Sequence, residues 1–367
     1  MNATIGRVLA DKGKWQPTHV LVTGNLGYIG VVLTPKLVSA GYDVLGLDVG
    51  YYQECNFGVA PNDDFRQIYK DVRDIEPDDL QGIDAIIHLA ALSNDPTGEL
   101  NPELTEEINC WASVRLARLA RDAGVRRFIF SSSCSIYGQG ESKTLTEEAP
   151  FHPVTAYARS KVKAEADIAA LADDNFSPVF LRNATAYGLS PRLRFDLVVN
   201  NLTGWAYTTQ QVRLMSNGEA WRPLVHVNDI VSAFLAALAA PREVIHNQAF
   251  NVGKDDGNYQ IRNVAETVAR IVPDCQVTYA AGASPDSRTY HVCFAKIQER
   301  LPEFKPAWNL EQGIRQLHDA FAGCGLPFED FDGRKYTRLK QLRYLLDANC
   351  LDSELRWNKV ETPVAAH

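Results

Sequence analysis

Short apolar runs alternate with longer stretches of helical periodicity through the first half of the chain. The runs are rich in β-branched and aromatic residues, as strands are, and the stretches between them include 105–123 and 157–172, where apolar residues recur at helical spacing. The runs that we predict to be strands are 19–23, 43–48, 84–89, 127–131 and 178–182. Strands that alternate with helices in this way predict an α/β fold, a doubly wound parallel sheet with helices on both faces.

The alternation becomes irregular after Gly188, where a loop opens, and stays so until about Trp308. This change predicts a smaller, interleaved α/β lobe, because a helix at 226–238 and a strand at 248–252 return to the pattern of the first half. The predicted division is a first domain at 16–188 with return segments at about 225–253, a smaller lobe at 189–224 and 254–320, and a C-terminal extension at 321–367.

The C-terminal extension is basic and partly apolar. Its cations are Arg334, Lys335, Arg338, Lys340 and Arg343, and no motif in it indicates a role. A solvated helix is the simplest interpretation.

Composition excludes several kinds of partner. The 367 residues, 46% hydrophobic and 22% charged, can bury a sizeable core, and a net charge of -8 argues against nucleic acid. Seven cysteines lie far apart, without a CxxC pair or a histidine cluster at zinc spacing, so we expect reduced thiols and no metal. No apolar leader and no window of about 20 apolar residues is seen, so we expect a cytoplasmic protein with no membrane partner.

A glycine-rich segment, TGNLGYIG at residues 23–30, lies between the first predicted strand and a helix. Gly24 permits a sharp turn, Gly27 lets the backbone approach a pyrophosphate, and Gly30 lets the helix lie close to the strand. Asp48 ends the second strand about 20 residues later, where a carboxylate binds the adenosine ribose and repels a 2′-phosphate. Glycines before a helix also occur in ordinary turns, but this order of elements predicts a Rossmann domain that binds NAD rather than NADP.

Two further groups of residues are expected at the dinucleotide. Asn25, Leu26, Tyr28 and Ile29 complete the glycine loop at a helix N-terminus, whose free N–H groups and dipole attract a pyrophosphate. Asp71 and Val72 follow a predicted third strand, where they could hold the adenine. A surface aspartate in YKDVRD explains Asp71 equally well.

A tyrosine and a lysine, Tyr157 and Lys161 of YARSK, are four residues apart and therefore on one face of a helix. A tyrosine hydroxyl has a pKa of about 10, which a nearby ammonium and a cationic nicotinamide would lower until Tyr157 can exchange a proton with a substrate hydroxyl. Ser133 of SSSCSIYG follows the strand at 127–131 and is expected to bond the reacting oxygen. Each feature alone is common on surfaces and loops, but their order after a glycine loop favours a catalytic group.

These motifs, together with HLAA at 88–91 and RPLVHVND at 222–229, resemble the extended short-chain dehydrogenase/reductases that act on nucleotide sugars. The resemblance covers about residues 17–320. It implies that Leu89, Ala90 and Ala91 join Tyr157 and Lys161 at NAD. It also implies that Tyr157 takes a proton while NAD takes a hydride from a ring carbon, commonly C4, and that both steps can run backwards.

Departures from the family pattern narrow the reaction. Family members that dehydrate their sugar carry an Asp-Glu pair where this chain has Cys134 and Ser135, so a dehydratase is disfavoured. Some relatives use a cysteine nearby to move a proton, but a buried structural thiol is the commoner role for Cys134. Relatives often have Asn at the position of Thr185, whereas here Asn183 lies two residues earlier, so the sugar-phosphate contact made there is in doubt.

Arginines recur in the smaller lobe, and guanidinium groups suit the two phosphates of a nucleotide-diphosphate sugar. Singly, each is more often a solvated surface residue. The residues expected at the substrate are Ser93, Ser133, Arg192, Asn201, Arg222 and Arg288, while Arg194 and Arg213 add to the positive charge. His226 and Asp229 are expected to tie the lobes together instead.

The sequence thus leads to three hypotheses. The first is a nucleotide-sugar 4-epimerase, because the Ser133, Tyr157 and Lys161 set is intact and the dehydratase acids are missing. The second is a 4-ketosugar reductase, and the third a non-catalytic NAD-binding regulator. The resemblance also implies a homodimer through helices 105–123 and 157–172, in which Val114 and Ile168 are expected to be exposed.

Overall fold

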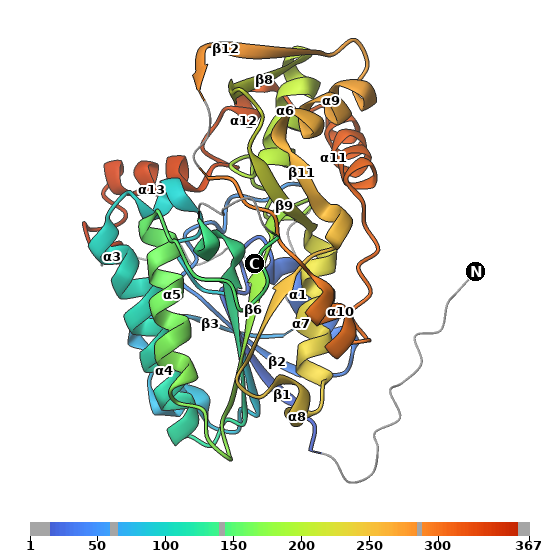
Figure 1. Cartoon of the computed structure of the whole chain (residues 1–367). Coiled ribbons are helices and arrows are strands. Elements are labelled where there is room, and N and C mark those ends of the chain that lie inside the picture. Colours follow the sequence, from blue (N-terminus) through green and yellow to red (C-terminus); the bar gives the residue numbers. More distant parts are fainter. Residues whose placement is uncertain (1–14, 59–64, 139–143, 285–287, 359–367) are drawn as a thin grey trace.

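The computed structural model describes residues 15–58, 65–138, 144–284 and 288–358 (Figure 1). Seven parallel strands form its main sheet in the order β10-β6-β5-β4-β1-β2-β3. Their bounds are β1 His19–Thr23, β2 Asp43–Asp48, β3 Arg66–Tyr69, β4 Ala85–His88, β5 Arg127–Ser133, β6 Ser177–Asn183 and β10 Gln248–Val252. The predicted doubly wound parallel sheet is confirmed.

Helices cover both faces of this sheet, and Figure 1 shows α4 and α5 on its left and α1 and α7 on its right. Each face has its own apolar layer, because the strands are buried on both sides. The helices of this part are α1 Gly30–Ser39, α2 Asp95–Gly98, α3 Pro102–Glu106, α4 Ala112–Asp122, α5 Ala156–Ala169, α7 Val227–Ala239, α8 Arg242–Ile245 and α10 Ala295–Arg300. Within the part of the chain that the structure describes, every helix is too short or too polar to span a bilayer.

A smaller lobe with its own apolar core lies above the carboxyl ends of the strands (Figure 1). It consists of β7 Thr185–Tyr187, α6 Val198–Thr209, β8 Gln211–Ser216, β9 Trp221–His226, β11 Asn258–Gln260, α9 Ile261–Ile271, β12 Gln276–Ser284, α11 Leu310–Cys324 and α12 Phe328–Phe331. The His226 ring stacks on Trp308 at 3.9 Å, and Asp229 accepts hydrogen bonds from the backbone N–H groups of Ala307 and Trp308. Both residues therefore have the structural role that the sequence predicted, while the exact domain division stays a prediction.

The helical stretch predicted at 105–123 is interrupted by a π-helical turn, Glu107–Trp111, between α3 and α4. The expectation that Val114 and Ile168 are exposed was wrong: they are 2% and 0% exposed. Both belong to the apolar layer between the helices and the sheet, because the apolar face of each helix packs inward. Trp111 is the large apolar side chain that this region exposes, at 57%.

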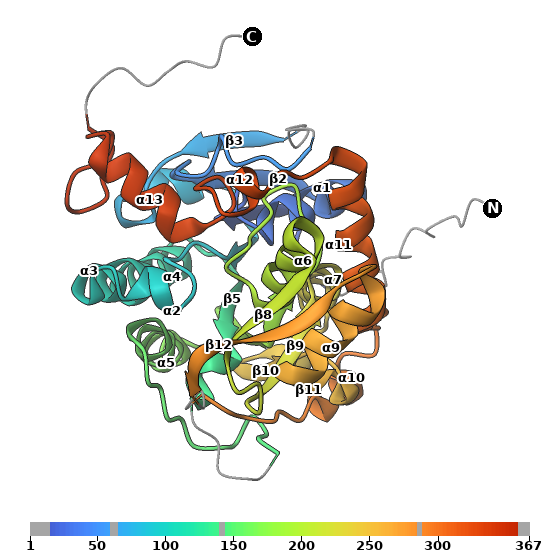
Figure 2. The same cartoon turned by 90° about the horizontal axis from the view of Figure 1, so that it is seen from above.

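The C-terminal extension is not a solvated helix, as its composition had suggested. Its helix α13, Arg338–Asp347, lies beside the β3 edge of the sheet and near α3 (Figure 2). Leu342, Leu345, Leu351 and Leu355 are buried in the same apolar layer as α4 and α5. Burial of these leucines explains why the extension packs on the first domain.

A buried ion pair fixes α5 to the sheet. Arg182 on β6 donates from Nε and Nη2 to the Glu165 carboxylate on α5, with the shortest distance 2.7 Å, and both side chains are 7% exposed. The same guanidinium donates from Nη1 to the carbonyl of Glu147 at 2.8 Å. The pair therefore positions the helix that carries Tyr157 and Lys161.

Arg182→Met should destabilise the protein by about 3–5 kcal/mol, because it leaves the Glu165 carboxylate buried without its partner. The double variant Arg182→Met/Glu165→Leu should recover a large part of this loss, since it removes both charges. Chemical denaturation of the three proteins at pH 7 measures the effect. Equal destabilisation of the single and double variants would contradict this account of the pair.

Candidate active site

A cavity of about 770 Å³ lies between the two lobes at the carboxyl ends of the strands. Ligands bind at this position in open parallel sheets. The predicted residues that line it are Gly24, Gly27, Tyr28, Ile29, Gly30, Asp48, Asp71, Val72, Leu89, Ala90, Ala91, Ser93, Ser133, Tyr157, Lys161, Asn201, Arg222 and Arg288. Asn25, Leu26 and Arg192 are absent from the lining among the described residues.

Gly24 and Gly30 have the structural roles in the glycine loop that the sequence predicted. Gly24 has φ of 72°, and a Cβ there would lie 2.6 Å from the backbone nitrogen of Ala90. A Cβ on Gly30 would lie 2.4 Å from the carbonyl oxygen of Gly24. At Gly27 a Cβ would meet only that same oxygen, at 3.1 Å, so Gly27 is the least crowded of the three glycines, and its contact with a pyrophosphate stays a prediction.

Asp48 stands at the end of β2, beside the glycine loop. Its carboxylate accepts hydrogen bonds from the backbone N–H groups of Leu26 at 3.2 Å and Gly50 at 2.7 Å. Burial raises the pKa of Asp48, and these hydrogen bonds act against that rise. The carboxylate lines the cavity next to Tyr51 and Tyr52, where an adenosine ribose would be held.

Three residues predicted around the dinucleotide and substrate also have structural contacts. The Asp71 carboxylate lines the cavity and accepts from Arg73 Nη2 at 2.8 Å. Asn25 donates from Nδ2 to Gln67 Oε1 at 2.7 Å. Arg192 donates from Nε to the carbonyl of Leu26 at 3.0 Å, so its guanidinium supports the glycine loop from behind.

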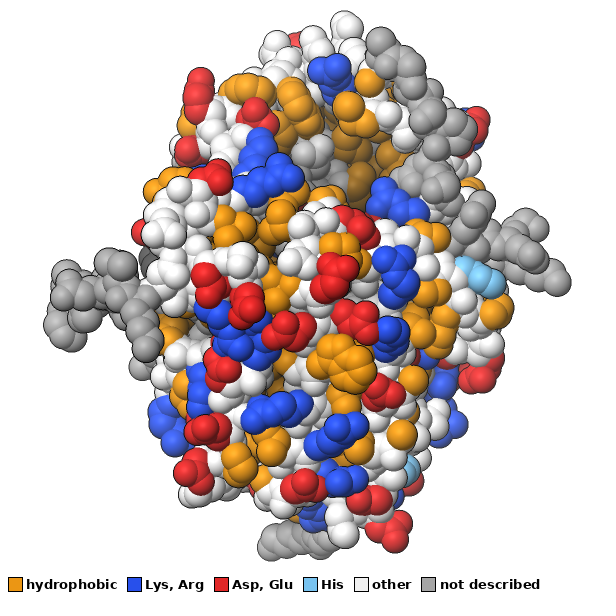
Figure 3. Space-filling view, turned by 90° about the vertical axis from the view of Figure 1, so that its left-hand side faces the viewer, with side chains coloured by type: hydrophobic (Ala, Val, Ile, Leu, Met, Phe, Trp, Pro, Cys, Tyr) orange, Lys and Arg blue, Asp and Glu red, His pale blue; other side chains and the backbone are white. Residues whose placement is uncertain are grey.

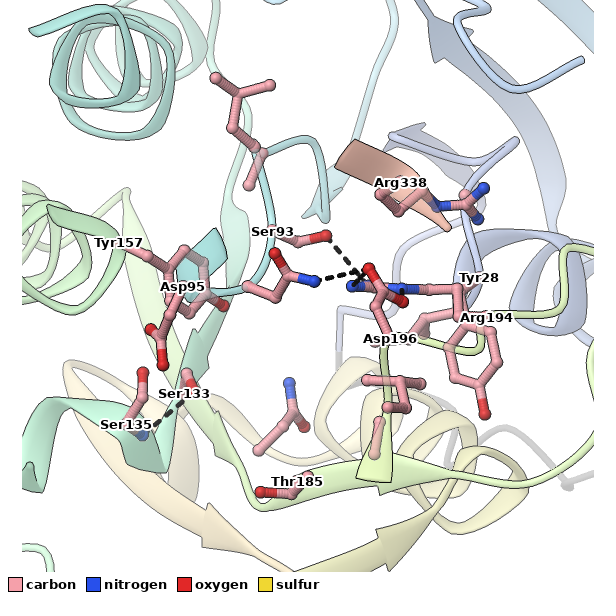
Figure 4. Close-up of a pocket in the computed structure, with 18 of the residues that line it drawn as sticks. Tyr28, Ser93, Asp95, Ser133, Ser135, Tyr157, Thr185, Arg194, Asp196 and Arg338 are labelled. Atoms are coloured by element: carbon pink, nitrogen blue, oxygen red, sulfur yellow. Dashed lines mark hydrogen bonds and ion pairs between the residues drawn. The ribbon is translucent and has the colours of Figure 1, made fainter. Parts of the chain in front are cut away.

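The catalytic residues predicted from sequence, Ser133, Tyr157 and Lys161, line the same cavity, and Figure 4 shows Ser133 and Tyr157 on one side of it. Thr155 caps α5 through a hydrogen bond that its Oγ1 accepts from Ala158 N at 3.2 Å, which places Tyr157 in the first turn. Lys161 donates from Nζ to the carbonyl of Ser131 at 2.8 Å and lies 5.9 Å from the centre of the Tyr157 ring. Ser133, at the end of β5, accepts from Ser135 N at 3.1 Å and interacts with Tyr157.

Burial dominates the protonation of the tyrosine and lysine. Burial raises the pKa of Tyr157 to about 12. The negative charge of Asp95 adds to this rise, whereas the hydrogen bond with Ser133 acts against it. The rise occurs without a coenzyme, because desolvation of the phenolate exceeds the favourable contacts, so the lowering expected beside a cationic nicotinamide stays a prediction. Burial also lowers the pKa of Lys161 to about 8.

The segment that departs from the family pattern shows which side chains face the cavity. Cys134 is fully buried, its thiol donates to the carbonyl of Arg182 at 3.1 Å, and burial raises its pKa, so it has the structural role. Ser135, Asn183 and Thr185 line the cavity instead. Asn183 donates from Nδ2 to Ser131 Oγ at 3.1 Å.

The smaller lobe contributes cations at the mouth of the cavity. Arg213 and Arg222 line it, and Arg222 lies 5.6 Å from the centre of the Tyr290 ring. Arg288 forms an ion pair with Asp95 at 2.6 Å, which links the two lobes. Asn201, also predicted at the substrate, donates from Nδ2 to the carbonyl of Phe195 at 2.8 Å.

Sequence reasoning missed Asp95, Asp196 and Arg338 at the cavity, and it predicted Arg194 only as a source of positive charge. Asp95 lies close to Tyr157 in Figure 4 and accepts from Thr155 Oγ1 at 2.7 Å. Arg194 forms a two-bond ion pair with Asp196, at 2.8 and 3.0 Å, and donates to Ser93 Oγ at 3.0 Å. The proximity of Asp95 to the HLAA motif was a usable signal, whereas no signal placed Arg338 of the extension at the cavity.

The glycine loop, Asp48 and the paired Tyr157 and Lys161 all face one cavity, and these residues fit a nicotinamide dinucleotide. Hydride transfer requires such a coenzyme next to a group that exchanges a proton with the substrate. The fold and site therefore define an enzyme of the extended short-chain dehydrogenase/reductase class. The family model described as the NAD dependent epimerase/dehydratase family matches residues 20–253, and the chain belongs to this family.

Individual relatives agree with this assignment. The chain is 31% identical over 246 residues to a UDP-glucose 4-epimerase of Mycolicibacterium smegmatis, covering 64% of this chain and 77% of the relative. It is 28% identical over 300 residues to a UDP-glucose 4-epimerase of Lactobacillus helveticus, covering 73% and 87%. The structure of MoeE5 in complex with UDP-glucose and NAD has a TM-score of 0.71 and 26% identity, covering 83% of this chain and 99% of that one. The protein is thus an NAD-dependent enzyme.

Gly27→Ala should lower the thermal midpoint slightly, because the Gly24 carbonyl 3.1 Å from the new methyl group must shift. It should weaken NAD binding by about tenfold or more, because the methyl group takes space expected for the pyrophosphate. Isothermal titration with NAD measures the affinity. Gly30→Ala is the contrasting variant, and it should fail to fold because its methyl group would overlap backbone. Unchanged NAD affinity in Gly27→Ala would show that this loop does not hold the pyrophosphate.

Proposed function

We propose that this protein is an NAD-dependent nucleotide-sugar 4-epimerase. The observation that carries the proposal is that Ser133, Tyr157 and Lys161 share one cavity with the Asp48 end of the glycine loop and with the arginines of the smaller lobe. This arrangement provides room for NAD and a nucleotide-diphosphate sugar in contact with each other. The UDP-glucose 4-epimerases among the relatives support the choice of reaction.

The chain's own residues perform the proton chemistry. Tyr157 accepts the proton of the sugar 4-hydroxyl, Ser133 holds the same oxygen, and the ammonium of Lys161 favours the tyrosine phenolate. NAD held by the glycine loop and Asp48 would supply the hydride acceptor and donor for C4 of the sugar, and a positive charge that would lower the pKa of Tyr157. Tyr157 then gives back the proton, so no net oxidation occurs.

The acidic residues near the tyrosine are consistent with this chemistry. Position 135 is a serine, and the nearby carboxylate of Asp95 is held by Arg288 and Thr155. A dehydratase needs a free acid and a free base for removal of a carbon-bound proton and of a hydroxyl. Among the described residues that line the cavity beside Tyr157, Asp95 is the carboxylic acid. Its contacts with Arg288 and Thr155 keep it from acting as the free acid or base of a dehydration.

The reaction is tested with a panel of UDP-, GDP-, CDP- and dTDP-sugars in D₂O, without added coenzyme, by NMR and mass spectrometry. The proposal expects interconversion of two 4-epimers without deuterium on any ring carbon, because the hydride returns from the coenzyme. In a parallel assay with a nucleotide-linked 4-ketosugar and added NADH or NADPH, stoichiometric consumption of the reduced coenzyme, together with no epimerisation in the panel, would identify a 4-ketosugar reductase instead. Deuterium incorporation or loss of water would refute a simple 4-epimerase.

Tyr157→Phe should lower kcat by about 10²-fold to 10⁴-fold, the usual contribution of a positioned acid–base group, and leave bound NAD in place. Coupled assays give kcat, and the absorbance of the protein after denaturation gives the NAD content. Tyr344→Phe, on the exposed face of α13, is the matched control and should behave as wild type. Undiminished turnover in Tyr157→Phe would exclude this tyrosine as the proton acceptor.

We further propose that the enzyme is a homodimer that pairs through the face formed by α4 and α5. Figure 3 shows this side of the molecule, where basic and acidic side chains are interspersed, a distribution that a two-fold interface can match with itself. Trp111, rather than Val114 or Ile168, is the exposed apolar residue here. It would provide the aromatic contact at the centre of the interface.

Trp111→Glu should convert a dimer into a monomer, because it places a charge in the apolar centre of the interface. Light scattering at micromolar concentration gives the mass. Tyr279→Glu replaces an aromatic residue of similar exposure in the smaller lobe and should stay dimeric. A monomeric wild-type protein would reject the proposal.

A further inference from the structure

The C-terminal extension covers the loop that follows Asp48. Trp357 donates from Nε1 to the carbonyl of Val49 at 2.7 Å, and Gln341 donates from Nε2 to the carbonyl of Tyr51 at 3.2 Å. The Tyr51 hydroxyl in turn donates to the carbonyl of Leu355. Since Tyr51 and Val49 line the cavity, the extension forms the outer wall of its adenosine end.

Arg338, the first residue of α13, reaches from the extension into this wall. It lines the cavity and is only 3% exposed. Its guanidinium lies 4.0 Å from the centre of the Tyr52 ring, and Nη2 donates to the carbonyl of Arg192 at 3.3 Å. Its Nη1 is buried and has no hydrogen-bond partner among the described residues.

The carboxylates near Arg338 already have other hydrogen-bond partners. Asp196 is already held by Arg194 through two hydrogen bonds, and Asp48 accepts from two backbone N–H groups. Burial, together with the positive charge of Arg194, lowers the pKa of Arg338. A buried cation with an unpartnered N–H donor lowers the stability of the fold unless an anion binds to it.

The position of Arg338 indicates which anion this is. Arg192, whose carbonyl Arg338 contacts, donates to the carbonyl of Leu26, so only one residue separates Arg338 from the glycine loop. Figure 4 shows Arg338 on the same side of the cavity as Tyr28 and Arg194, away from Tyr157. Arg213 and Arg222 lie on β8 and β9 of the smaller lobe.

We propose that Arg338 binds the diphosphate of NAD, so that the C-terminal extension supplies part of the coenzyme site. A dinucleotide diphosphate on the glycine loop would lie between the N–H groups of the α1 N-terminus and the open donor of Arg338. The guanidinium is already held by Tyr52 and Arg192, so it loses little conformational freedom when it binds the diphosphate. The inference concerns coenzyme binding and does not depend on which sugar is converted.

The experiment measures ligand binding to the full chain, without turnover. Wild type, Arg338→Met, Arg338→Lys and Arg343→Met are titrated with NAD and ADP by calorimetry, and adenosine, 2′,5′-ADP and UDP are measured by competition. Arg343, exposed on the same helix, is the matched control because its replacement removes an equal charge. Thermal midpoints without ligand show whether each variant is folded.

Arg338→Met should weaken NAD and ADP by about 10-fold to 100-fold, as loss of a hydrogen bond to a charged group does, and change adenosine less than about twofold. Arg343→Met should bind all ligands as wild type does, and Arg338→Lys should fall between the two. If Arg338→Met does not fold, Arg338→Lys must still weaken ADP more than adenosine.

Three results would overturn the proposal. An equal loss for ADP and adenosine would mean that Arg338 only supports the loop. A loss confined to 2′,5′-ADP would assign it to a 2′-phosphate, and a loss confined to UDP would assign it to the sugar nucleotide. Undiminished ADP affinity in a folded Arg338→Met would remove it from the site altogether.

Discussion

The close contact between the glycine turn and the end of β4 is the constraint on which the rest of the site depends. Gly24 brings the backbone so near to Ala90 that no side chain fits between them, and Gly30 does the same between α1 and the turn. The ends of β1 and β4 therefore meet at one point of the sheet edge. The pyrophosphate loop, Asp48 and the HLAA segment share a cavity as a result.

Local patterns predicted most of the sheet and of the coenzyme site. The bounds predicted for β1, β2 and β10 agree with the structure, those of β4 and β6 differ by one residue at each end, and those of β5 differ by two residues at one end. The glycine loop, Ser133, Tyr157 and Lys161 were found because each lies within a short segment whose order along the chain is informative. Such motifs need no knowledge of distant contacts.

The features that sequence did not predict depend on contacts between distant residues. Gln341 and Tyr51 are 290 positions apart, so no local pattern could join α13 to the loop after β2. The periodicity of α4 and α5 showed an apolar face but not whether it meets the sheet or another subunit, which explains the error at Val114 and Ile168. Likewise, the sequence suggested that the Arg192 guanidinium binds a substrate phosphate, but in the structure it donates to the carbonyl of Leu26.

The route of the extension has a consequence for the order in which the protein folds. Trp357 bonds to Val49 across 308 positions of sequence, and Arg338 stacks on Tyr52. During synthesis, the loop after β2 must therefore remain without its cover until the ribosome has released nearly all of the later chain. The rings of Tyr51 and Tyr52 remain exposed to solvent during that interval. The nascent first domain is therefore a candidate for chaperone protection until α13 packs against it.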